Sequence, residues 1–575
     1  MKDNSPEMSG KVFRWLSLAV IVAALATVFL HTFELAAVTN VWDDSYMTFR
    51  FAHNILAHGV FAWNGSIPSF GFTSTAHILV MLAIAMFSNN PTVVVTIASV
   101  IGAVLFLISI PFLIASVIPA SERIARRLTI ALSFTIVALA ALGFNSIAIS
   151  GMDTMLALAF VSLYLIVILR SACSIGTLSR GKLAGIGLLG TCAFLVRPDL
   201  MLFTVFIPLS LALWSRTQRE RTNAWIILAI TAVSLALLLA GLWAYFGTPL
   251  PLAFFVKSIG NLYGPITLSR LKFQPILQFL IYFDAYRFLF IAPIVFVLVG
   301  WRRVFSRGEH AIVIGMLASV GAYILYFLFF VVQLMGVSGR FYYPTIPILL
   351  TLTALLILHL FQKFSGTDVH RMRLFVAGAA SVVMLVLLYS PLMWGIQQLG
   401  YSIMSGTLFN RVAWQGNILA LYEQGSYGKT RWPCLDVWAA LPNDASIATT
   451  EIGMPAVLAP EKFLEDISGL QSNDIALHHV PFDQAIIDHK IDIVYLPTEQ
   501  YYPELRAEIL SSPAFQQQYK IYYRGDPFQL DVAVRNDSPY AATLEKCLAA
   551  VIPPGGIENP PVISKYYLSL PYPLM

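Results

Sequence analysis

The chain has 575 residues, of which 58% are hydrophobic and only 12% are charged, whereas soluble domains are roughly 45–50% apolar and about 25% charged. This composition excludes a purely soluble enzyme. The charge is unevenly divided: residues up to Trp394 contain 25 Lys and Arg against 12 Asp and Glu, and the remainder contains 11 against 19. The basic excess is not that of a nucleic-acid-binding protein, because it lies in small clusters between apolar runs.

Apolar runs of the length that a membrane span needs, about 20 residues, recur along the first 394 residues. We predict eleven spans, near residues 15–33, 92–118, 128–145, 152–169, 183–196, 199–214, 225–246, 288–301, 310–334, 344–362 and 374–394. Most basic residues of this region fall in loops on one side, which the positive-inside rule makes cytoplasmic. The first run lacks a clear cleavage site and is expected to stay as a span. We therefore expect a multi-pass protein of the cytoplasmic (inner) membrane with a cytoplasmic N-terminus.

The first extracytoplasmic loop, residues 34–91, opens with an acidic pair, Asp43 and Asp44. Two adjacent carboxylates at a membrane exit can divide acid–base work, one carrying a proton while the other stays charged. If the following stretch is helical, Arg50 lies about two turns on and Asn54 one turn further, on one polar stripe. A helix cap explains the acidic pair equally well, since acidic N-caps are common.

The apolar segment from Ser74 to Phe87 determines the topology of everything after it. If it crossed the membrane, every later basic loop would move to the outer side, against the positive-inside rule. Its short length is also typical of a helix that does not span. We therefore expect an interfacial or re-entrant helix on the outer face.

Four further polar clusters lie at the outer ends of predicted spans. Taken alone, Asp153 is more simply a helix cap, and Arg197 with Asp199 a local salt bridge. The cations at these outer ends, combined with the acids of the first loop, are what a transferase acting on a phosphate-linked donor requires. In such an enzyme the cations stabilise the leaving phosphate, and a carboxylate orients the acceptor. We predict Asp43 and Asp44 as catalytic, and place the donor phosphate or other substrate groups at Arg50, Asn54, Asp153, Arg197, Asp199, Lys257 and Arg340.

The tail, residues 395–575, has the more ordinary composition of a soluble domain and is expected on the extracytoplasmic side. Its patterns predict a mixed α/β layer, with strands at 447–449, 491–496, 520–523 and 530–534 and helices at 436–441 and 503–510. A disulfide between Cys434 and Cys547 and a pair of buried thiols are both compatible with the sequence. Glu451 and Asp466 could line a cleft for the acceptor sugar, although plain solvation of loop acids is the simpler interpretation.

A resemblance to a known family rests on several of these motifs together. The first-loop pattern DD-x-Y-x-x-x-R-x-A-x-N, followed by Trp63-Asn64 and Gly71-Phe72-Thr73-Ser74, and then Gly-Met-Asp, Arg-Pro-Asp and Gly-Arg-Phe, resembles integral-membrane glycosyltransferases of the GT-C superfamily. Among these, the chain is most similar to bacterial arabinofuranosyltransferases that add terminal β-arabinofuranose to cell-wall arabinan. The resemblance is strong in the first loop and weaker through the later spans. His53, Phe72 and Asp153 depart from the usual pattern and leave the sugar open.

The resemblance implies a fold, a donor and an acceptor. The fold is mostly α, with a polytopic helical catalytic domain over residues 1–394 and a C-terminal extracytoplasmic mixed α/β domain over residues 395–575, which could bind the glycan acceptor. The donor is a polyprenyl-phosphate sugar, the acceptor is a cell-envelope glycan, and Asp43 and Asp44 match the family's acidic pair. No cofactor is implied. A divalent cation could bridge an acid and the phosphate, but no spaced ligand set predicts a metal site.

Other functions remain open at this level. A GT-C transferase could instead modify lipopolysaccharide, a glycolipid or a protein. A transporter or flippase for a lipid-linked sugar would also have many spans and a basic cavity. A proton-coupled transporter fits less well, because charges near the membrane midplane are almost absent from the predicted spans. A scaffold protein would leave the clustering of charge at one membrane face unexplained.

Overall fold

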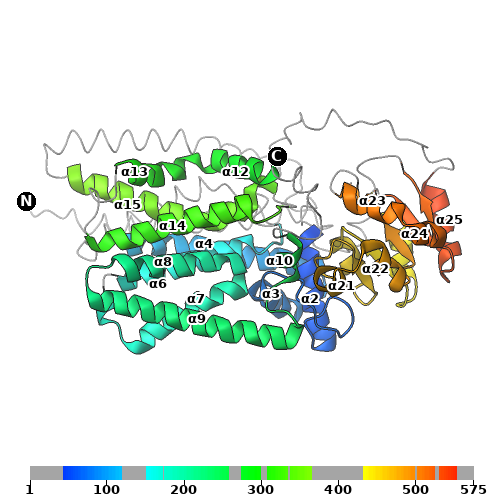
Figure 1. The fold of residues 1–575 in the computed structure, drawn as a ribbon, viewed down its shortest axis with the longest axis horizontal. Coiled ribbons are helices and arrows are strands. Elements are labelled where there is room, and N and C mark those ends of the chain that lie inside the picture. Colours follow the sequence, from blue (N-terminus) through cyan, green and yellow to red (C-terminus); the bar gives the residue numbers. More distant parts are fainter. Residues whose placement is uncertain are drawn as a thin grey trace, which may run out of the picture. The chain divides into compact units, whose positions relative to one another are not determined.

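The computed structural model describes residues 43–118, 150–172, 174–257, 273–299, 307–333, 337–364, 431–498, 502–524 and 530–552. The chain forms two compact units, Met1–Gly416 and Asn417–Met575. The predicted boundary after residue 394 and the observed division both lie outside the described residues. The predicted class, a mostly helical membrane region followed by a mixed α/β region, is confirmed (Figure 1).

The first unit is a bundle of apolar helices. Four helices in its described part are long and apolar enough to cross a membrane, namely α4 (Pro91–Val117), α6 (Thr154–Ala172), α9 (Gln218–Phe246) and most of α14 (Arg307–Phe329). A fifth crossing is formed if α12 (Phe273–Tyr286) and α13 (Ile291–Val299), bent by 96° at η4 (Arg287–Phe290), act as one broken span. The predicted runs at 183–196, 199–214 and 344–362 form α7 (Arg180–Val196), α8 (Met201–Trp214) and α15 (Ile346–Phe364). The runs predicted at 15–33, 128–145 and 374–394 lie outside the described residues.

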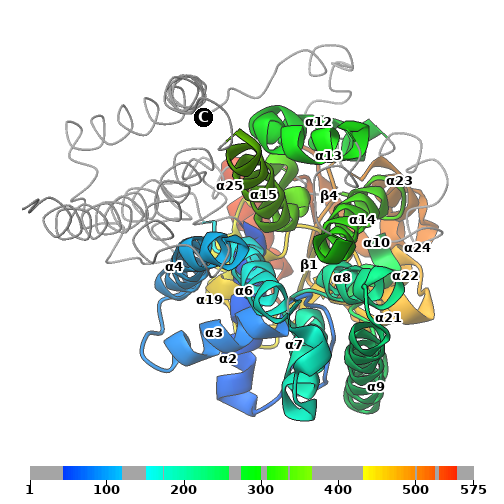
Figure 2. The same ribbon diagram turned by 90° about the vertical axis from the view of Figure 1, so that its left-hand side faces the viewer.

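Small and hydroxylated residues allow these helices to approach closely. A Cβ atom on Gly102 of α4 would lie 2.8 Å from the backbone nitrogen of Leu156 in α6. Thr191 of α7 donates to the carbonyl of Thr231 in α9 at 3.2 Å and shares a 2.5 Å hydrogen bond with Ser234. Such contacts drive helix association inside a bilayer, where burial of apolar surface gives no advantage. Figure 2, viewed along the helices, shows the neighbouring pairs α4 with α6 and α8 with α14.

Helix α9 carries the marks of a lipid-facing span. It begins with a capping box between Thr217 and Glu220 and ends at Gly247 in the left-handed conformation. Its Trp225 and Trp243 are both exposed, and at 1.5 Å per residue they lie about 27 Å apart along the axis. That spacing matches the hydrocarbon thickness of a bilayer, whose two interfaces favour tryptophan.

Short helices gather at one end of the bundle (Figure 1). These are α2 (Asp43–His58), α3 (Thr75–Ala85) and α10 (Leu252–Lys257). With 11 residues, α3 is about 16 Å long and too short to cross a core of about 30 Å. It packs against α2, α4 and α7, in agreement with the prediction that this segment does not span. Arg170 donates to Ser116 where α6 and α4 end, so this basic residue lies at the opposite end of these two helices.

The second unit contains a five-stranded mixed sheet in the order β2-β1-β3-β5-β4. The strands β1 (Ile447–Thr449), β2 (Leu464–Asp466) and β3 (Ile493–Tyr495) are parallel, whereas β5 (Val532–Arg535) runs antiparallel to β3 and to β4 (Tyr519–Tyr522). The sequence predicted every strand except β2, two of whose three residues, Glu465 and Asp466, are of types that are uncommon in strands. The helices are α19 (Leu435–Ala440), α20 (Gly453–Leu458), α21 (Asn473–His478), α22 (Phe482–Asp488), α23 (Pro503–Ser511), α24 (Pro513–Gln518) and α25 (Ala541–Val551).

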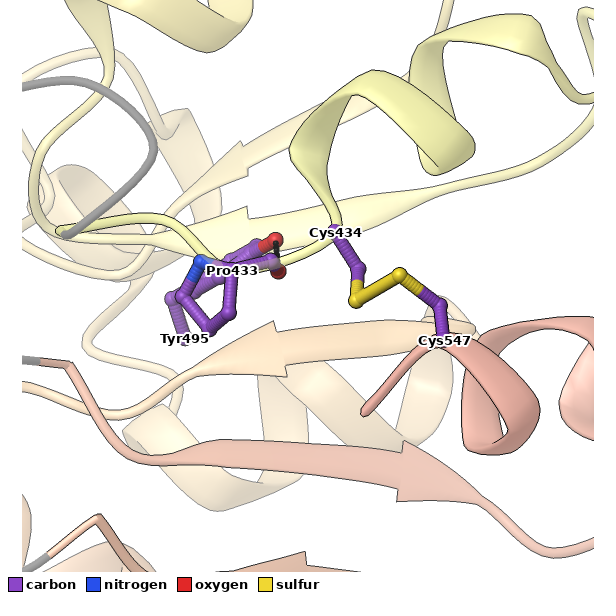
Figure 3. Close-up of a disulfide and its surroundings, with 4 residues drawn as sticks. All are labelled: Pro433, Cys434, Tyr495 and Cys547. Atoms are coloured by element: carbon purple, nitrogen blue, oxygen red, sulfur yellow. Dashed lines mark hydrogen bonds between the residues drawn. A yellow bond between two sulfur atoms is a disulfide. The ribbon is translucent and has the colours of Figure 1, made fainter. Parts of the chain in front are cut away.

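A disulfide joins the start of α19 to α25 (Figure 3). The Cα atoms of Cys434 and Cys547 lie 6.1 Å apart, and 113 residues separate them in the sequence. Next to the bridge, the Tyr495 hydroxyl at the end of β3 donates to the carbonyl of Pro433 at 2.6 Å. The bridge and this hydrogen bond tie the two helices to the central sheet.

We expect that replacing Cys434 and Cys547 together by serine lowers the stability of the second unit. A loop this long contributes about 4–5 kcal/mol in the chain-entropy account of disulfides. Thermal unfolding of the full chain in detergent should show an earlier transition. The matched control is Cys192→Ser, since Cys192 is free and exposed. An unchanged transition in the double variant would contradict a stabilising role.

Candidate functional site

An ion pair connects the first loop to the segment before α15. The Arg340 guanidinium donates to Asp44 Oδ2 at 3.1 Å. Asp44 lies in the first turn of α2, where a carboxylate also interacts favourably with the helix dipole. Arg340 lies in η6 (Val337–Thr345), whose Gly339 has a φ of +68° and would clash with Tyr282 if it carried a Cβ atom. The acid and the cation singled out from the sequence therefore meet, although 296 positions separate them.

A second Arg–Asp pair lies near the ring of Phe341. Arg197 binds Asp199 with two hydrogen bonds, of 3.1 and 2.8 Å, and the Tyr323 hydroxyl of α14 donates to the same carboxylate. The guanidinium carbons of Arg197 and Arg340 lie 6.0 and 5.2 Å from the centre of the Phe341 ring. One aromatic ring thus contacts both guanidinium groups, which places two cations and their acids in one site.

Asp153 reaches the same site from the start of α6. Its charge acts on Arg197 and on His77 of α3. The preceding Gly151 has a φ of +82°, and a Cβ atom there would lie 2.6 Å from Ser45, the residue after Asp44. Buried His77 holds this turn through a 2.9 Å hydrogen bond between its Nε2 atom and the Gly151 carbonyl. The turn before α6 is therefore pressed against the start of α2.

Arg50 and Asn54 hold the first loop in place. Arg50 is 1% exposed; it donates to the Trp63 carbonyl at 2.7 Å and to Asn64 Oδ1 at 3.1 Å, and its guanidinium carbon lies 4.8 Å from the Trp63 ring centre. The Asn54 amide donates to the carbonyls of Ala62 and Trp63 at 2.8 and 3.0 Å. These contacts give both residues a structural role in the first loop, and their role in substrate binding stays a prediction.

Lys257 ends α10 at the same end of the bundle. Its carbonyl accepts from the amide of Val332 at 2.8 Å, and the amide of Leu252, which starts α10, donates to the Phe70 carbonyl of the first loop at 2.8 Å. The loop is also held by Phe246 of α9, which stacks on Phe70 with ring centres 4.8 Å apart. Helix α10 therefore connects the first loop to the segment that leads toward Arg340.

The two acids predicted for acceptor binding are part of the fold of the second unit. Glu451 follows β1 and forms a 2.7 Å ion pair with Arg431. Asp466 ends β2, is 1% exposed, and accepts hydrogen bonds from Ser468 and from the amide of Gln471. Burial raises the pKa of Asp466 to about 7, against the opposite effect of those hydrogen bonds. Neither acid is a solvated loop residue.

Three residues of the site were missed in the sequence or seen only as part of a motif. Tyr323 lies within an apolar span and has no local signal, because its partner Asp199 is 124 positions away. His77 lies within the apolar segment of α3. Phe341 belongs to the Gly-Arg-Phe motif, but only the fold reveals that it contacts both arginines. In the described part of the chain, no group of three or more His, Cys, Asp or Glu could hold a metal ion.

The site can therefore bind an anion and can place a carboxylate beside it. Two guanidinium groups in a partly buried environment favour phosphate, which accepts several charge-assisted hydrogen bonds. The acids that hold these cations fix their positions before any ligand arrives. A phosphate that contacts Arg340 would compete with Asp44 for the same donor.

Comparison with known proteins gives distant structural likenesses alone. No protein-family profile matches the chain, and no curated protein matches its sequence. The structure is similar to ArnT from Cupriavidus metallidurans bound to undecaprenyl phosphate, with a TM-score of 0.49, 14% identity, and coverage of 91% of this chain and 98% of that one. It is also similar to the Archaeoglobus fulgidus oligosaccharyltransferase tethered to an acceptor peptide, with a TM-score of 0.49, 11% identity, and coverage of 91% and 74%. At this degree of likeness, function has to be argued from the residues of this chain.

We expect Arg50→Gln to loosen the first loop. The variant loses a charged hydrogen bond to a buried carbonyl, which costs about 2–3 kcal/mol. Limited proteolysis should then cut residues 59–74 faster than in the native chain. Arg287→Gln is the control, because its ion pair with Asp284 is exposed and such pairs contribute roughly 0–1 kcal/mol. A specific loss of donor affinity with unchanged proteolysis would instead support the predicted role in substrate binding.

We expect Gly151→Ala to disturb the site by displacing the start of α2. The added methyl group would clash with Ser45, and the positive φ disfavours any residue except glycine. Together these effects should cost about 1–3 kcal/mol and displace the start of α2. Gly241→Ala in α9 is the control, because its Cβ atom would meet no atom within 4 Å. Equal melting temperatures for the two variants would show that the close approach at Gly151 is not required.

Proposed function

We propose that this protein is a membrane glycosyltransferase that moves a sugar from a polyprenyl-phosphate donor to a cell-envelope acceptor at the outer face of the cytoplasmic membrane. The observation that carries the proposal is the contact of Arg197 and Arg340 with one Phe341 ring, with Asp44 paired to Arg340. This arrangement offers a phosphate-binding pair of cations beside a carboxylate, at one end of an apolar bundle. The resemblance of the first-loop motif to GT-C enzymes supports the same reaction class.

The proposed reaction begins when the donor phosphate binds between Arg340 and Arg197. The phosphate takes hydrogen bonds from Arg340, so that Asp44 loses its cationic partner and becomes available to the acceptor hydroxyl. The acceptor oxygen then forms a bond to the anomeric carbon as the bond from that carbon to the phosphate oxygen breaks. Polyprenyl phosphate leaves with the electron pair, and the hydroxyl proton passes to the Asp43–Asp44 pair.

The other charged residues have supporting roles in this proposal. Asp199 and Tyr323 orient the Arg197 guanidinium, since three hydrogen bonds meet at that carboxylate. Asp153 lies close enough to act on the charge of Arg197. Lys257, at the end of α10, is a further candidate for the donor phosphate. For the donor sugar we propose arabinofuranose, on the resemblance of the first loop to arabinofuranosyltransferases.

We expect Asp44→Asn to lower kcat for sugar transfer at least about 100-fold, because general acid–base catalysis contributes a factor of this order or more. The assay uses the full chain in liposomes, a panel of polyprenyl-phosphate sugars and cell-wall glycan acceptors, with Asp43→Asn tested in parallel. If transfer survives both substitutions, Asp43 and Asp44 are not catalytic and serve only as acidic residues in the first turn of α2. Movement of the lipid-linked sugar across the bilayer without any transfer would favour a transporter.

The double variant Asp44→Arg/Arg340→Asp separates the structural role of the ion pair from the chemical one. Each single variant places two like charges together and should lower thermal stability, whereas the double variant restores an ion pair and should recover most of it. Because the carboxylate and the guanidinium have exchanged places, we expect transfer to remain lost. Recovery of both stability and transfer would mean that the pair serves the fold alone.

A further inference from the structure

The second unit has a cavity of about 320 Å³ that lies apart from the acids predicted for acceptor binding. It opens at the amino ends of the parallel strands. Asp444 and Ser446 precede β1, Phe463 precedes β2, and Asp492 precedes β3. Arg535 reaches the same edge because β5 runs antiparallel to β3. Glu451 and Asp466 lie at the carboxyl ends of β1 and β2, at the opposite edge of the sheet.

A buried carboxylate fixes the floor of this cavity. Asp492 is 3% exposed and accepts two hydrogen bonds from Ser446, one from its amide at 2.8 Å and one from its hydroxyl at 3.0 Å. Its other oxygen accepts from Arg535 at 2.9 Å and from Ser538 at 2.7 Å. Because each of these donors is anchored in or beside the sheet, the cavity is formed before any ligand binds.

The rim presents donors and acceptors to solvent. The Tyr540 hydroxyl donates to Asp444 Oδ1 at 2.5 Å, and the second oxygen of this exposed carboxylate can accept from a ligand. Lys490 is exposed and has a φ of +49°, a conformation that few residues with a side chain adopt. Hydroxyl groups of a ligand both donate and accept, so that they can bond to a carboxylate and an ammonium group in the same cavity.

The remaining wall is aromatic, and the charges of the lining balance. The ring of Phe463 packs edge-on against His489, with ring centres 5.0 Å apart, and His489 is held by Glu465 at 3.1 Å. Asp444 and Asp492 offset Lys490 and Arg535 among the lining residues. A free phosphate would meet these carboxylates as like charges. Aromatic surface beside balanced polar groups fits a neutral polyhydroxylated ligand.

We propose that this cavity binds one or two sugar residues of a neutral glycan and thereby retains a long acceptor on the protein. The retention role rests on the proposed function, whereas glycan binding itself does not. The volume lies at the lower end of the range for ligand pockets, about 300–1,000 Å³, which suits so short a segment. The cavity is distinct from the site at Asp44 and Arg340, which would act on the end of the acceptor.

The first test measures binding without any donor. Native full-length protein in detergent is titrated with neutral arabino-, galacto- and manno-oligosaccharides, by calorimetry and saturation-transfer NMR. We expect Asp444→Asn and Lys490→Ala to weaken binding about tenfold, a change of about 1.4 kcal/mol. Lys546→Ala is the matched control, because Lys546 is exposed on α25 and outside the cavity. Equal affinities for all variants, or displacement of the glycan by inorganic phosphate, would overturn the proposal.

The second test separates this proposal from the proposed enzymatic function. In the transfer assay, the cavity variants should raise the KM for long acceptors about tenfold. They should leave kcat and the KM for short acceptors unchanged. A native chain that transfers sugar but whose KM does not depend on these residues would refute the retention role. If the protein binds glycans in this cavity but transfers no sugar, the proposed binding site stands and the proposed function is refuted.

Discussion

The ion pair between Asp44 and Arg340 is the interaction on which the arrangement of the site depends. The Arg340 side chain is 6% exposed and that of Asp44 is 19% exposed, so neither is fully solvated. An ion pair removed from water gains little over an apolar pair of the same shape, but breaking it leaves a buried charge at high cost. The pair is therefore better understood as a device that fixes position. It joins the start of α2 to the segment before α15, two parts of the chain that local sequence cannot bring together.

The second Arg–Asp pair extends the same principle. The two guanidinium groups near the Phe341 ring would repel each other if no negative charge lay nearby. Asp199 and Asp153 supply that negative charge. The positions of the cations are thus set by acids that also limit the net charge of the empty site. The donor phosphate, a diester with one negative charge, can exchange places with a carboxylate without creating a large excess of either sign. In the proposed mechanism, binding of the donor phosphate and release of Asp44 from Arg340 are therefore one event.

The sequence predicted the classes of structure well and the partners of single residues poorly. Apolar period and length predicted the helices, and short strand-like runs rich in β-branched and aromatic residues predicted four of the five strands, because these signals are local. The local salt bridge between Arg197 and Asp199 was foreseen, since two positions separate them. The pairing of Asp44 with Arg340 was not, because it depends on a contact across 296 positions. Arg50 illustrates the limit, because the sequence did not predict its hydrogen bonds to the Trp63 carbonyl and to Asn64. A buried arginine that holds carbonyl groups of its own loop has the same sequence signature as one that faces a phosphate.

The placement of charge also bears on the kind of donor that the proposed site would accept. Charged residues in the interior of a bilayer are costly, and here the paired charges lie at helix ends, where apolar surface meets water. Helix α9, with exposed apolar residues between two interfacial tryptophans, presents a lipid-facing surface that reaches the same end of the bundle. A donor with a long isoprenoid chain could keep that chain in the bilayer while its phosphate reaches the arginines. A soluble nucleotide sugar would gain nothing from this placement, so the position of the site favours a lipid-linked donor independently of any motif.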